Sequence, residues 1–261
     1  MLRSLSTAAT GMLAQQTNID VISNNLANVN TTGFKKSRAE FQDLLSQTIR
    51  APGAQVAQGT YQPSGIQIGL GVKNSAVQRI NTAGVMMQTD NPLNVAIQGE
   101  GYYQIQLDDG TLAYTRDGNF KMDANGQLVT SDGFQLQPQI SIPEDATQVI
   151  ITNGGKVTVQ QPGSAELTEV GTIELVRFAN PSGLQSIGKN LLIETGASGT
   201  PIQGIANQEG FGSIEQGFVE GSNVQVVEEL INLITAQRAF EANSNVIRAS
   251  DEALKTANRM V

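Results

Sequence analysis

Few side chains in this 261-residue chain could carry out chemistry, because it contains no cysteine, histidine or tryptophan. A disulfide, a thiolate nucleophile and a Cys/His metal site are therefore excluded, and the commonest general base is missing. Carboxylates remain, but no spacing between them indicates the pair facing across a cleft that a peptidoglycan hydrolase would need. We predict that the chain is not an enzyme and holds no catalytic residue and no cofactor.

The nearest approach to a metal-ligand set in the sequence is Asp117, Asn119 and Asp123. Their spacing does not match an EF-hand, which needs oxygens at loop positions one, three and five and a glutamate at position twelve. Aspartate in a hairpin turn is usually there for its backbone geometry. The stretch Gly69-Leu70-Gly71 lacks the third glycine and the acidic partner of a dinucleotide-binding fingerprint. We therefore predict no metal site and no cofactor-binding site.

The net charge of −8 is spread unevenly along the chain. Residues 1–38 contain four Lys or Arg and one acid, and residues 222–261 contain four Lys or Arg and five acids, so the intervening residues carry −10. An acidic middle argues against nucleic acid, whose phosphates demand a basic surface. No apolar run is long enough to span a membrane, and the N-terminal stretch lacks the continuous apolar core of a secretory signal peptide.

The N-terminal stretch of the chain shows a heptad pattern, which predicts the first element that could position a functional surface. Large apolar residues recur every seven positions, with small or polar residues between them at steps of three and four. This pattern is typical of a helix that packs along one seam, and Gly33 stands where a helix commonly ends. The predicted seam residues are Leu2, Leu5, Ala9, Met12, Gln16, Ile19, Ser23 and Leu26.

The C-terminus repeats the same rule over a longer stretch. Ser222 and Gln225 have the spacing of a capping box, and Asn223 is an alternative N-cap. A helix from about 224 to 261 would be about 57 Å long. Its predicted seam residues are Val226, Leu233, Ala236, Phe240, Asn243, Ile247, Ser250, Leu254, Ala257 and Val261.

Because both terminal helices share one large/small heptad rule, we expect them to pack together. A hairpin with one narrow seam that contains Gln16, Asn243 and Ser250 would be marginal alone, so we expect copies of the chain to complete the packing. An intramolecular two-helix coiled coil is the alternative. If the helices of the free subunit have room, Ala236→Leu should leave its stability unchanged and block polymerisation.

The middle of the chain predicts antiparallel β-structure. Short runs alternate apolar and polar residues, and the hairpin dipeptides Asp109-Gly110, Asp117-Gly118, Asn125-Gly126 and Asp132-Gly133 fall between them. This spacing favours a meander, with further strands at 149–151, 157–159, 173–178 and 191–194. The predicted fold class is α+β, in which long N- and C-terminal helices pack as a coiled-coil-like axial domain and the middle of the chain forms a central antiparallel all-β domain.

Between the first helix and the β region, the stretch Ser46–Lys73 is rich in Gly and Gln and has no helical period. It predicts an extended segment or a long hairpin, with a flexible linker as the alternative. Five of its residues are more apolar than a solvated linker needs, which suggests docking: Val56, Tyr61, Ile66, Ile68 and Leu70. The expected division is 1–34 with 222–261 as the helical domain, 35–74 as the extended segment and 75–221 as the β-rich outer domain.

Three stretches carry a resemblance to a known family: "SNNLANVNTTGFKKSRAEF", "DGTLAYTRDGNFKMDANGQLVTSDGFQLQP" and "EGSNVQVVEELINLITAQRAFEANSNVIRASDEAL". In order, spacing and span the chain resembles the flagellar rod and hook family of bacteria. The segment "PSGIQIGLGV" looks like the characteristic stretch of the distal rod branch, the FlgG family. The resemblance covers essentially the whole chain.

The resemblance implies a helical homopolymer whose terminal helices line the core of a tube, with β-rich domains outside. It implies export through the flagellar type III apparatus and a place in the basal body across the periplasm, as a rigid drive shaft. The implied partners are other copies of the chain, proximal rod proteins, the hook protein, and the outer-membrane and peptidoglycan ring proteins. Separately from the resemblance, we expect the segment Gln47–Gly65 to stiffen the polymer, because it is apolar without a helix or clear strand pairing of its own.

The Asn-rich stretch before Phe34 is expected to join the helical layer to the β domain, with Gly33 permitting the reversal of the chain. The residues assigned to this joint are Asn25, Ala27, Asn28, Thr32, Gly33, Phe34 and Lys35. Alternatives to a distal rod subunit are a paralogous rod or hook protein, a β-type binding module on a coiled-coil stalk, and an enzyme that uses carboxylates.

Overall fold

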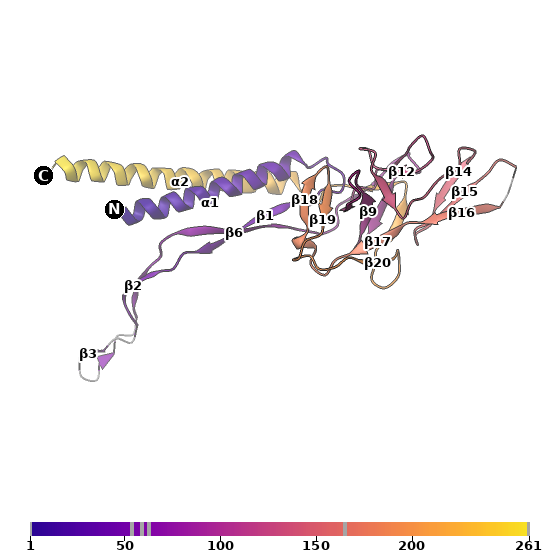
Figure 1. Cartoon of the computed structure of the whole chain (residues 1–261). Coiled ribbons are helices and arrows are strands. Elements are labelled where there is room, and N and C mark those ends of the chain that lie inside the picture. Colours follow the sequence, from indigo (N-terminus) through magenta and orange to yellow (C-terminus); the bar gives the residue numbers. More distant parts are fainter. Residues whose placement is uncertain (1, 53–54, 58–59, 62–63, 164–165, 260–261) are drawn as a thin grey trace. The chain divides into compact units, whose positions relative to one another are not determined.

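The computed structural model describes residues 2–52, 55–57, 60–61, 64–163 and 166–259, and the chain forms two compact units (Figure 1). The helical unit comprises the described residues of 1–27, 37–78 and 225–261, and the β unit comprises those of 28–36 and 79–224. Residues 28–36 thus group with the β unit and residues 37–78 with the helices, whereas the sequence suggested 1–34 and 35–74. The fold class is α+β.

In the helical unit, α1 (Leu2–Ala27) and α2 (Val226–Arg259) lie side by side. Ser4 Oγ is 3.4 Å from Ser250 Oγ, Gly11 lies against the side chain of Asn243, and Asn25 Nδ2 donates to Glu229 Oε2 at 3.4 Å. Each step along α1 is matched by an equal step back along α2. The two helices therefore run antiparallel without a change of register, which confirms that they pack together.

The first helix ends at Ala27, before the predicted stop at Gly33. Turns follow, in which Thr31 N donates to Asn28 O at 3.2 Å and Phe34 N donates to Thr31 O at 3.3 Å. Asparagine and threonine compete for backbone hydrogen bonds outside a helix, which explains the early end. Gly33 has φ +69°, so its left-handed conformation serves a turn rather than a helix end.

A two-stranded ribbon completes the helical unit. It pairs β1 (Ser37–Asp43) with β6 (Val72–Arg79), β2 (Gln47–Arg50) with β5 (Ile66–Ile68), and β3 (Gln55–Ala57) with β4 (Thr60–Tyr61). Leu44 N donates to Gly71 O at 2.8 Å between the first two pairs. The segment is therefore a long hairpin, one of the two forms that the sequence predicted.

The β unit is built around β9 (Tyr102–Gln106), which pairs with β10 (Leu112–Thr115) on one edge and with β13 (Gln135–Gln137) and β17 (Glu174–Arg177) on the other. The largest sheet runs β11-β12-β13-β9-β10-β19-β18, with β20 beside β17. Its remaining strands are β11 (Lys121–Met122), β12 (Leu128–Val129), β18 (Gln185–Gly188), β19 (Leu191–Ile193) and β20 (Ile202–Ile205).

Smaller sheets and one short helix complete the β unit. The sheet β14-β15-β16 is antiparallel, β21 pairs with β8, and β22 pairs with β7. The bounds are β7 (Met86–Gln88), β8 (Val95–Gln98), β14 (Gln148–Ile151), β15 (Lys156–Gln160), β16 (Leu167–Thr172), the 3₁₀-helix η1 (Pro181–Gly183), β21 (Ser213–Gln216) and β22 (Phe218–Glu220).

The predicted meander is only partly correct. Gly110, Gly126 and Gly133 have positive φ in the turns where hairpin dipeptides were expected. Asp117-Gly118 forms no hairpin, because β10 pairs with β9 and β19 while β11 pairs with β12. A Cβ on Gly118 would lie 1.5 Å from Val95 O, so this glycine is required by the close approach of another strand.

The core of the β unit consists of the residues that alternate inward along these strands. Tyr103, Ile105, Phe120 and Leu136 are fully buried in it, and the rings of Tyr103 and Phe120 meet edge to face at 5.1 Å. Tyr114 and Phe178 belong to a second, smaller cluster. The aromatic residues therefore pack inside the unit, as their alternation predicts.

Candidate functional site

The predicted seam of α2 lies on the side of that helix that is covered within the helical unit. Ala236 and Ser250 are buried, and six further seam residues are half-buried. These six are Leu233, Phe240, Asn243, Ile247, Leu254 and Ala257. Val226 is 41% exposed, and Val261 lies outside the described residues.

In α1, the four most buried residues lie outside the predicted seam. The most buried are Ala8, Ala14, Ile22 and Asn25. The predicted residues Leu5, Ala9, Met12, Ile19 and Leu26 are half-buried, Gln16 and Ser23 are exposed, and the side chain of Leu2 lies outside the described residues.

The reason is that α1 has two neighbours on adjacent faces. Gly11 lies against α2, whereas Thr10 accepts from Val72 N at 3.4 Å and Thr17 accepts from Asn74 Nδ2 at 2.7 Å, both in the ribbon. Gly11, Thr10 and Thr17 are small enough to allow close approach at both contacts, and the larger Ile22 is buried as well. That the predicted seam residues of α1 contact other copies stays a prediction.

Asn25 fixes the end of α1. Its amide makes two bonds to the backbone of Ser37, donating from Nδ2 to the carbonyl at 2.8 Å and accepting at Oδ1 from the amide at 2.9 Å. It is 2% exposed, and Nδ2 also donates to Glu229 on α2. One side chain thus joins α1, α2 and the start of β1 by replacing backbone hydrogen bonds that a strand would make.

In the β unit, a polar cluster formed by Lys35, Arg116, Glu220 and Asn223 joins three segments that are far apart in the sequence, and all but the half-buried Asn223 are buried. Glu220 is 1% exposed, and its two carboxylate oxygens accept from Lys35 Nζ and, at 2.8 Å, from Arg116 Nε. Lys35 Nζ also donates to Thr82 O at 2.8 Å. We call this set the Glu220 cluster.

Every N–H of the Arg116 side chain has a partner. Besides Glu220, the guanidinium donates to the carbonyls of Gly99, Gly101 and Ile97 at 2.6 to 3.3 Å. A buried charge of this kind is tolerated only when paired and fully hydrogen-bonded. Burial alone would raise the pKa of Glu220, but the charges and hydrogen bonds of Arg116 and Lys35 outweigh it and hold that pKa below its ordinary value.

The turn after α1 is bonded to the same unit. Thr32 Oγ1 donates to Asp117 Oδ1 at 2.9 Å, and Asn190 Nδ2 donates to Thr32 O at 3.1 Å. A Cβ on Gly33 would lie 2.7 Å from Asp117 N, so only glycine fits between these partners. Burial raises the pKa of Asp117, against the lowering effect of its hydrogen bonds.

The joint residues predicted from the sequence are thus shared between the two units. Asn25 and Ala27 lie in the helical unit, whereas Asn28, Thr32, Gly33, Phe34 and Lys35 lie in the β unit. Sequence reasoning missed Arg116, Glu220 and Asn223. One signal was available, since all three fall within the stretches that carry the family resemblance, but nothing local marked them as partners.

The acidic turns use their carboxylates locally. Asp117 Oδ1 accepts from Asn119 N at 3.1 Å, and Asp123 Oδ1 accepts from Asn125 N and Gln127 N at 2.8 Å. These are turn hydrogen bonds. Within the part of the chain that the structure describes, no three His, Cys, Asp or Glu side chains gather as metal ligands would.

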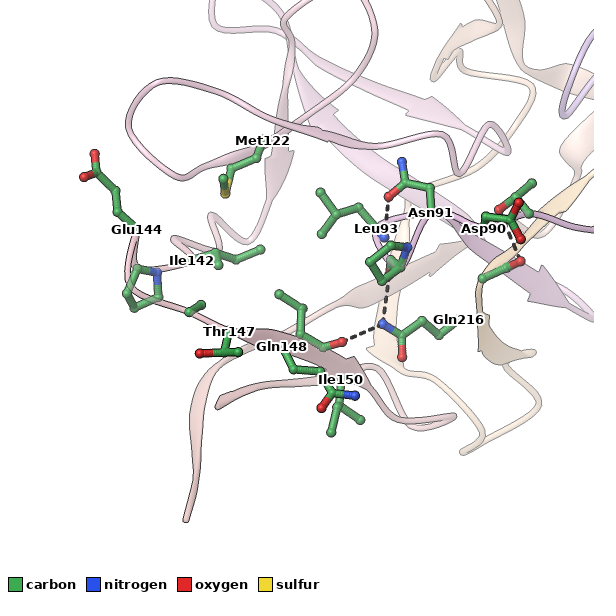
Figure 2. A pocket seen from close by; sticks show the side chains of 16 residues that line it. Asp90, Asn91, Leu93, Met122, Ile142, Glu144, Thr147, Gln148, Ile150 and Gln216 are labelled. Carbon is green, nitrogen blue, oxygen red and sulfur yellow. Dashed lines mark hydrogen bonds between the residues drawn. The ribbon is translucent and has the colours of Figure 1, made fainter. Parts of the chain in front are cut away.

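A groove of about 850 Å³ in the β unit is lined by the residues before β8, by residues before and within β14, and by Met122, Gln216 and Gly217 (Figure 2). Its two acids, Asp90 and Glu144, lie at opposite ends of the view in Figure 2. They do not form the facing pair that carboxylate catalysis needs. Gln216 bridges Pro92 O and Val149 O from Nε2, at 2.8 and 2.9 Å.

Large apolar side chains are exposed on the helical unit at two places. On the first part of α2, Val227 is 71% exposed and Ile231 is 59% exposed, with Leu230 and Ile234 beside them. On the ribbon, Leu45 is 89% exposed, and Ile49, Ile66, Ile68 and Leu70 are also exposed. The side chains of Val56 and Tyr61 lie outside the described residues. Contiguous apolar exposure of this kind marks contact surfaces.

Family models match three stretches of the chain. The model described as flagella basal body rod protein matches residues 5–35, that of the flagellar hook protein FlgE/F/G D1 domain matches 96–159, and that of the flagellar basal body rod FlgEFG protein C-terminal matches 215–260. Two terminal helices around a β-rich middle, with these matches, define a flagellar rod or hook protein.

The proteins most useful for placing the chain within this class of rod and hook proteins are relatives that match its whole length. The chain is 50% identical to the flagellar basal-body rod protein FlgG of Borreliella burgdorferi, over 100% of this chain and 99% of that protein. It is 48% identical to FlgG of Caulobacter vibrioides, over 99% of both chains, and 31% identical to the flagellar hook-basal body complex protein FlhP of Bacillus subtilis, again over 99% of both.

The chain therefore belongs to the FlgG family of flagellar basal-body rod proteins. It is a structural subunit of the distal rod and not an enzyme. No helix in the described part of the chain combines the length and the apolar character needed to cross a membrane.

Proposed function

We propose that copies of this subunit polymerise through the faces of α1 and α2 that remain open, and that the helices form a coiled-coil-like axial domain in the rod. The observation that carries this proposal is the exposed apolar strip of Val227, Leu230, Ile231 and Ile234 on α2. Burying such a strip against neighbours gains about 25 cal/mol per Å² of apolar area.

In this proposal the predicted seams have two roles. The α2 seam holds the two helices of one subunit together, because Ala236, Asn243 and Ser250 lie on its covered side. The half-buried residues of α1, such as Leu5, Met12 and Ile19, complete contacts with other copies. The two narrow seams leave neither helix fully covered in the described subunit, which supports assembly with further copies.

Ile231→Asp tests the proposal. Because Ile231 is exposed, the subunit should fold with its stability changed by no more than about 0.5 kcal/mol, yet a carboxylate buried between copies should block rod formation. Asn232→Asp is the matched control, since it adds the same charge one residue away on a face with Glu228 and Thr235. Rods of normal length with Ile231→Asp, seen by electron microscopy, would exclude this strip as a contact.

We also propose that the ribbon stiffens the rod and that the chain divides functionally into an axial part (1–34 and 222–261), a stiffening segment (35–74) and an outer part (75–221). The exposed residues Leu45, Ile49, Ile66 and Ile68 support a contact outside the subunit for the ribbon. The ribbon has short strands and is only two strands wide, so its strand pairing alone gives it little stability.

The remaining proposal concerns location and partners. We infer that the rod spans the periplasm, is exported by the flagellar type III apparatus, and meets proximal rod proteins, the hook protein and the ring proteins of the outer membrane and peptidoglycan. Family membership supports this assignment. Cross-linking of intact basal bodies followed by mass spectrometry tests it, and linkage to none of these proteins would overturn it.

A further inference from the structure

Three segments of the β unit are joined directly to the helical unit by the chain: residues 28–36, the residues from 79 onward, and the residues up to 224. Each of them carries a part of the Glu220 cluster or bonds to it. The first contributes Lys35, the second contributes the carbonyl of Thr82, and the third contributes Glu220 and Asn223.

Glu220 bonds to the other two segments through both its side chain and its backbone. Its carbonyl accepts from Gly33 N at 2.8 Å, and its Oε1 accepts from Gly84 N at 2.8 Å as well as from Lys35 Nζ. The next residue, Gly221, donates to Val85 O at 2.8 Å. A Cβ on Gly84 would lie 1.9 Å from Gly221 O, so the two backbones are in direct contact there.

Asn223 repeats the arrangement three residues later. Its Oδ1 accepts from Lys36 N at 2.7 Å, and its Nδ2 donates to Ile80 O at 2.9 Å and to Thr82 Oγ1 at 3.0 Å. Ile80 N donates in turn to Lys36 O at 2.9 Å. The three segments are therefore bonded to one another at two successive levels, the first at Glu220 and the second at Asn223. At each level the central side chain comes from the segment that ends at residue 224.

Arg116 anchors this arrangement to the rest of the β unit. It follows β10 directly, and its guanidinium holds Glu220 on one side and the carbonyls of residues 97–101 on the other. Arg116, directly after β10, thus fixes the position of the Glu220 carboxylate. The carboxylate in turn fixes the positions of the three segments through its hydrogen bonds. None of the four residues of the Glu220 cluster belongs to the main apolar core of the unit.

We propose that Glu220 is a positioning residue for rod assembly, which fixes the course of all three segments that leave the β unit for the helical unit. In the proposed rod, torque passes between the helical unit and the β unit through these segments, because the chain connects the two units there. A single flexible linker would allow the two units to rotate against each other. These three segments are instead held to one another, by the carboxylate of Glu220 and by Asn223, where they leave the β unit. The proposal rests on the rod function of the family.

Glu220→Gln tests the proposal in the full-length subunit. The amide has the same shape but no charge, so it leaves Lys35 and Arg116 without their shared anion. In hydrogen exchange, protection of the amides of Gly33, Lys36 and Gly84 should fall together by about 10- to 100-fold, with that of the β9 strand unchanged. Rods that contain this variant should be bent in electron micrographs.

Glu100→Gln is the matched control, because the Glu100 side chain is 76% exposed and 3.8 Å from its partner Arg177. It should change neither protection nor rod shape. Asn223→Ala is a second variant in case Glu220→Gln does not fold. It removes the second level of bonds only and should lower protection at Lys36 and Ile80 while keeping that of Gly84.

Loss of protection at one segment alone, or an equal loss in β9, would overturn the proposal, because Glu220 would then be local or part of the general core. Loss at all three segments with rods as straight as those of the unchanged chain would also overturn it. Exchange is measured on the subunit, so this result is independent of whether Ile231→Asp blocks polymerisation.

Discussion

Gly11→Ala in α1 tests the packing of the two helices at a single pair of residues. An ideal Cβ on Gly11 would lie 2.8 Å from Nδ2 and 3.3 Å from Cγ of Asn243. In an open helix the change stabilises by about 1 kcal/mol, because alanine loses less backbone entropy than glycine. Here the amide of Asn243 must rotate away, and an off-rotamer side chain costs about 0.5–1.5 kcal/mol. We expect the two effects to offset each other nearly completely.

The background Asn243→Ala removes the obstacle. Gly11→Ala should then stabilise the subunit by nearly the full ~1 kcal/mol, so the coupling energy of the double-mutant cycle should be about 0.5–1.5 kcal/mol. The assay is urea unfolding of the full-length subunit, followed by far-ultraviolet circular dichroism. Asn245→Ala, at an exposed position of the same helix, is the control background and should leave the effect of Gly11→Ala near zero.

Equal stabilisation by Gly11→Ala in all three backgrounds would refute this reasoning. It would show that Asn243 does not face Gly11 and that the antiparallel register of α1 and α2 is wrong.

Three further predictions concern the packing of α1 on α2, the ribbon and the Glu220 cluster. Ala236 is 3% exposed, so Ala236→Leu should already destabilise the free subunit by about 1–3 kcal/mol in urea unfolding. This is contrary to the sequence-based expectation that the helices have room. The control Ala242→Leu, at an exposed position, should change stability by less than about 0.5 kcal/mol. Deletion of Gln47–Gly65 should leave the melting temperature of the β unit unchanged, because the segment belongs to the helical unit, and should give bent rods; a lower melting temperature would contradict this. The pKa of Glu220 in the folded state lies below that of an unfolded glutamate, about 4.3. The stabilisation that ionised Glu220 contributes is therefore present above a pH of about 4.3 and is lost as the pH falls through the folded pKa. Glu220→Gln should flatten the acid limb of a stability–pH curve, and an unchanged acid limb would contradict the pairing.

The sequence by itself determined the features that depend on local periodicity. Heptad spacing predicts both helices, and the α2 seam from Leu233 to Ala257 lies on the covered side of the helix, where its small residues Ala236 and Ser250 are buried. Hairpin dipeptides locate the turns at Gly110, Gly126 and Gly133, since these positions need positive φ. The motifs at both ends and in the middle predict the family, which the comparisons confirm.

Only the tertiary structure decided which face of α1 packs inward, because that depends on the ribbon as a second neighbour beside α2. It also decided the strand order, in which β13 and β17 both pair with β9 across long intervals of sequence. The Glu220 cluster is the clearest case. Lys35 and Arg116 are 185 and 104 residues from Glu220, and no local pattern marks three charged residues as partners until the fold buries them together. Burial then makes their pairing obligatory, because an isolated charge in that interior would be far more costly than a paired one.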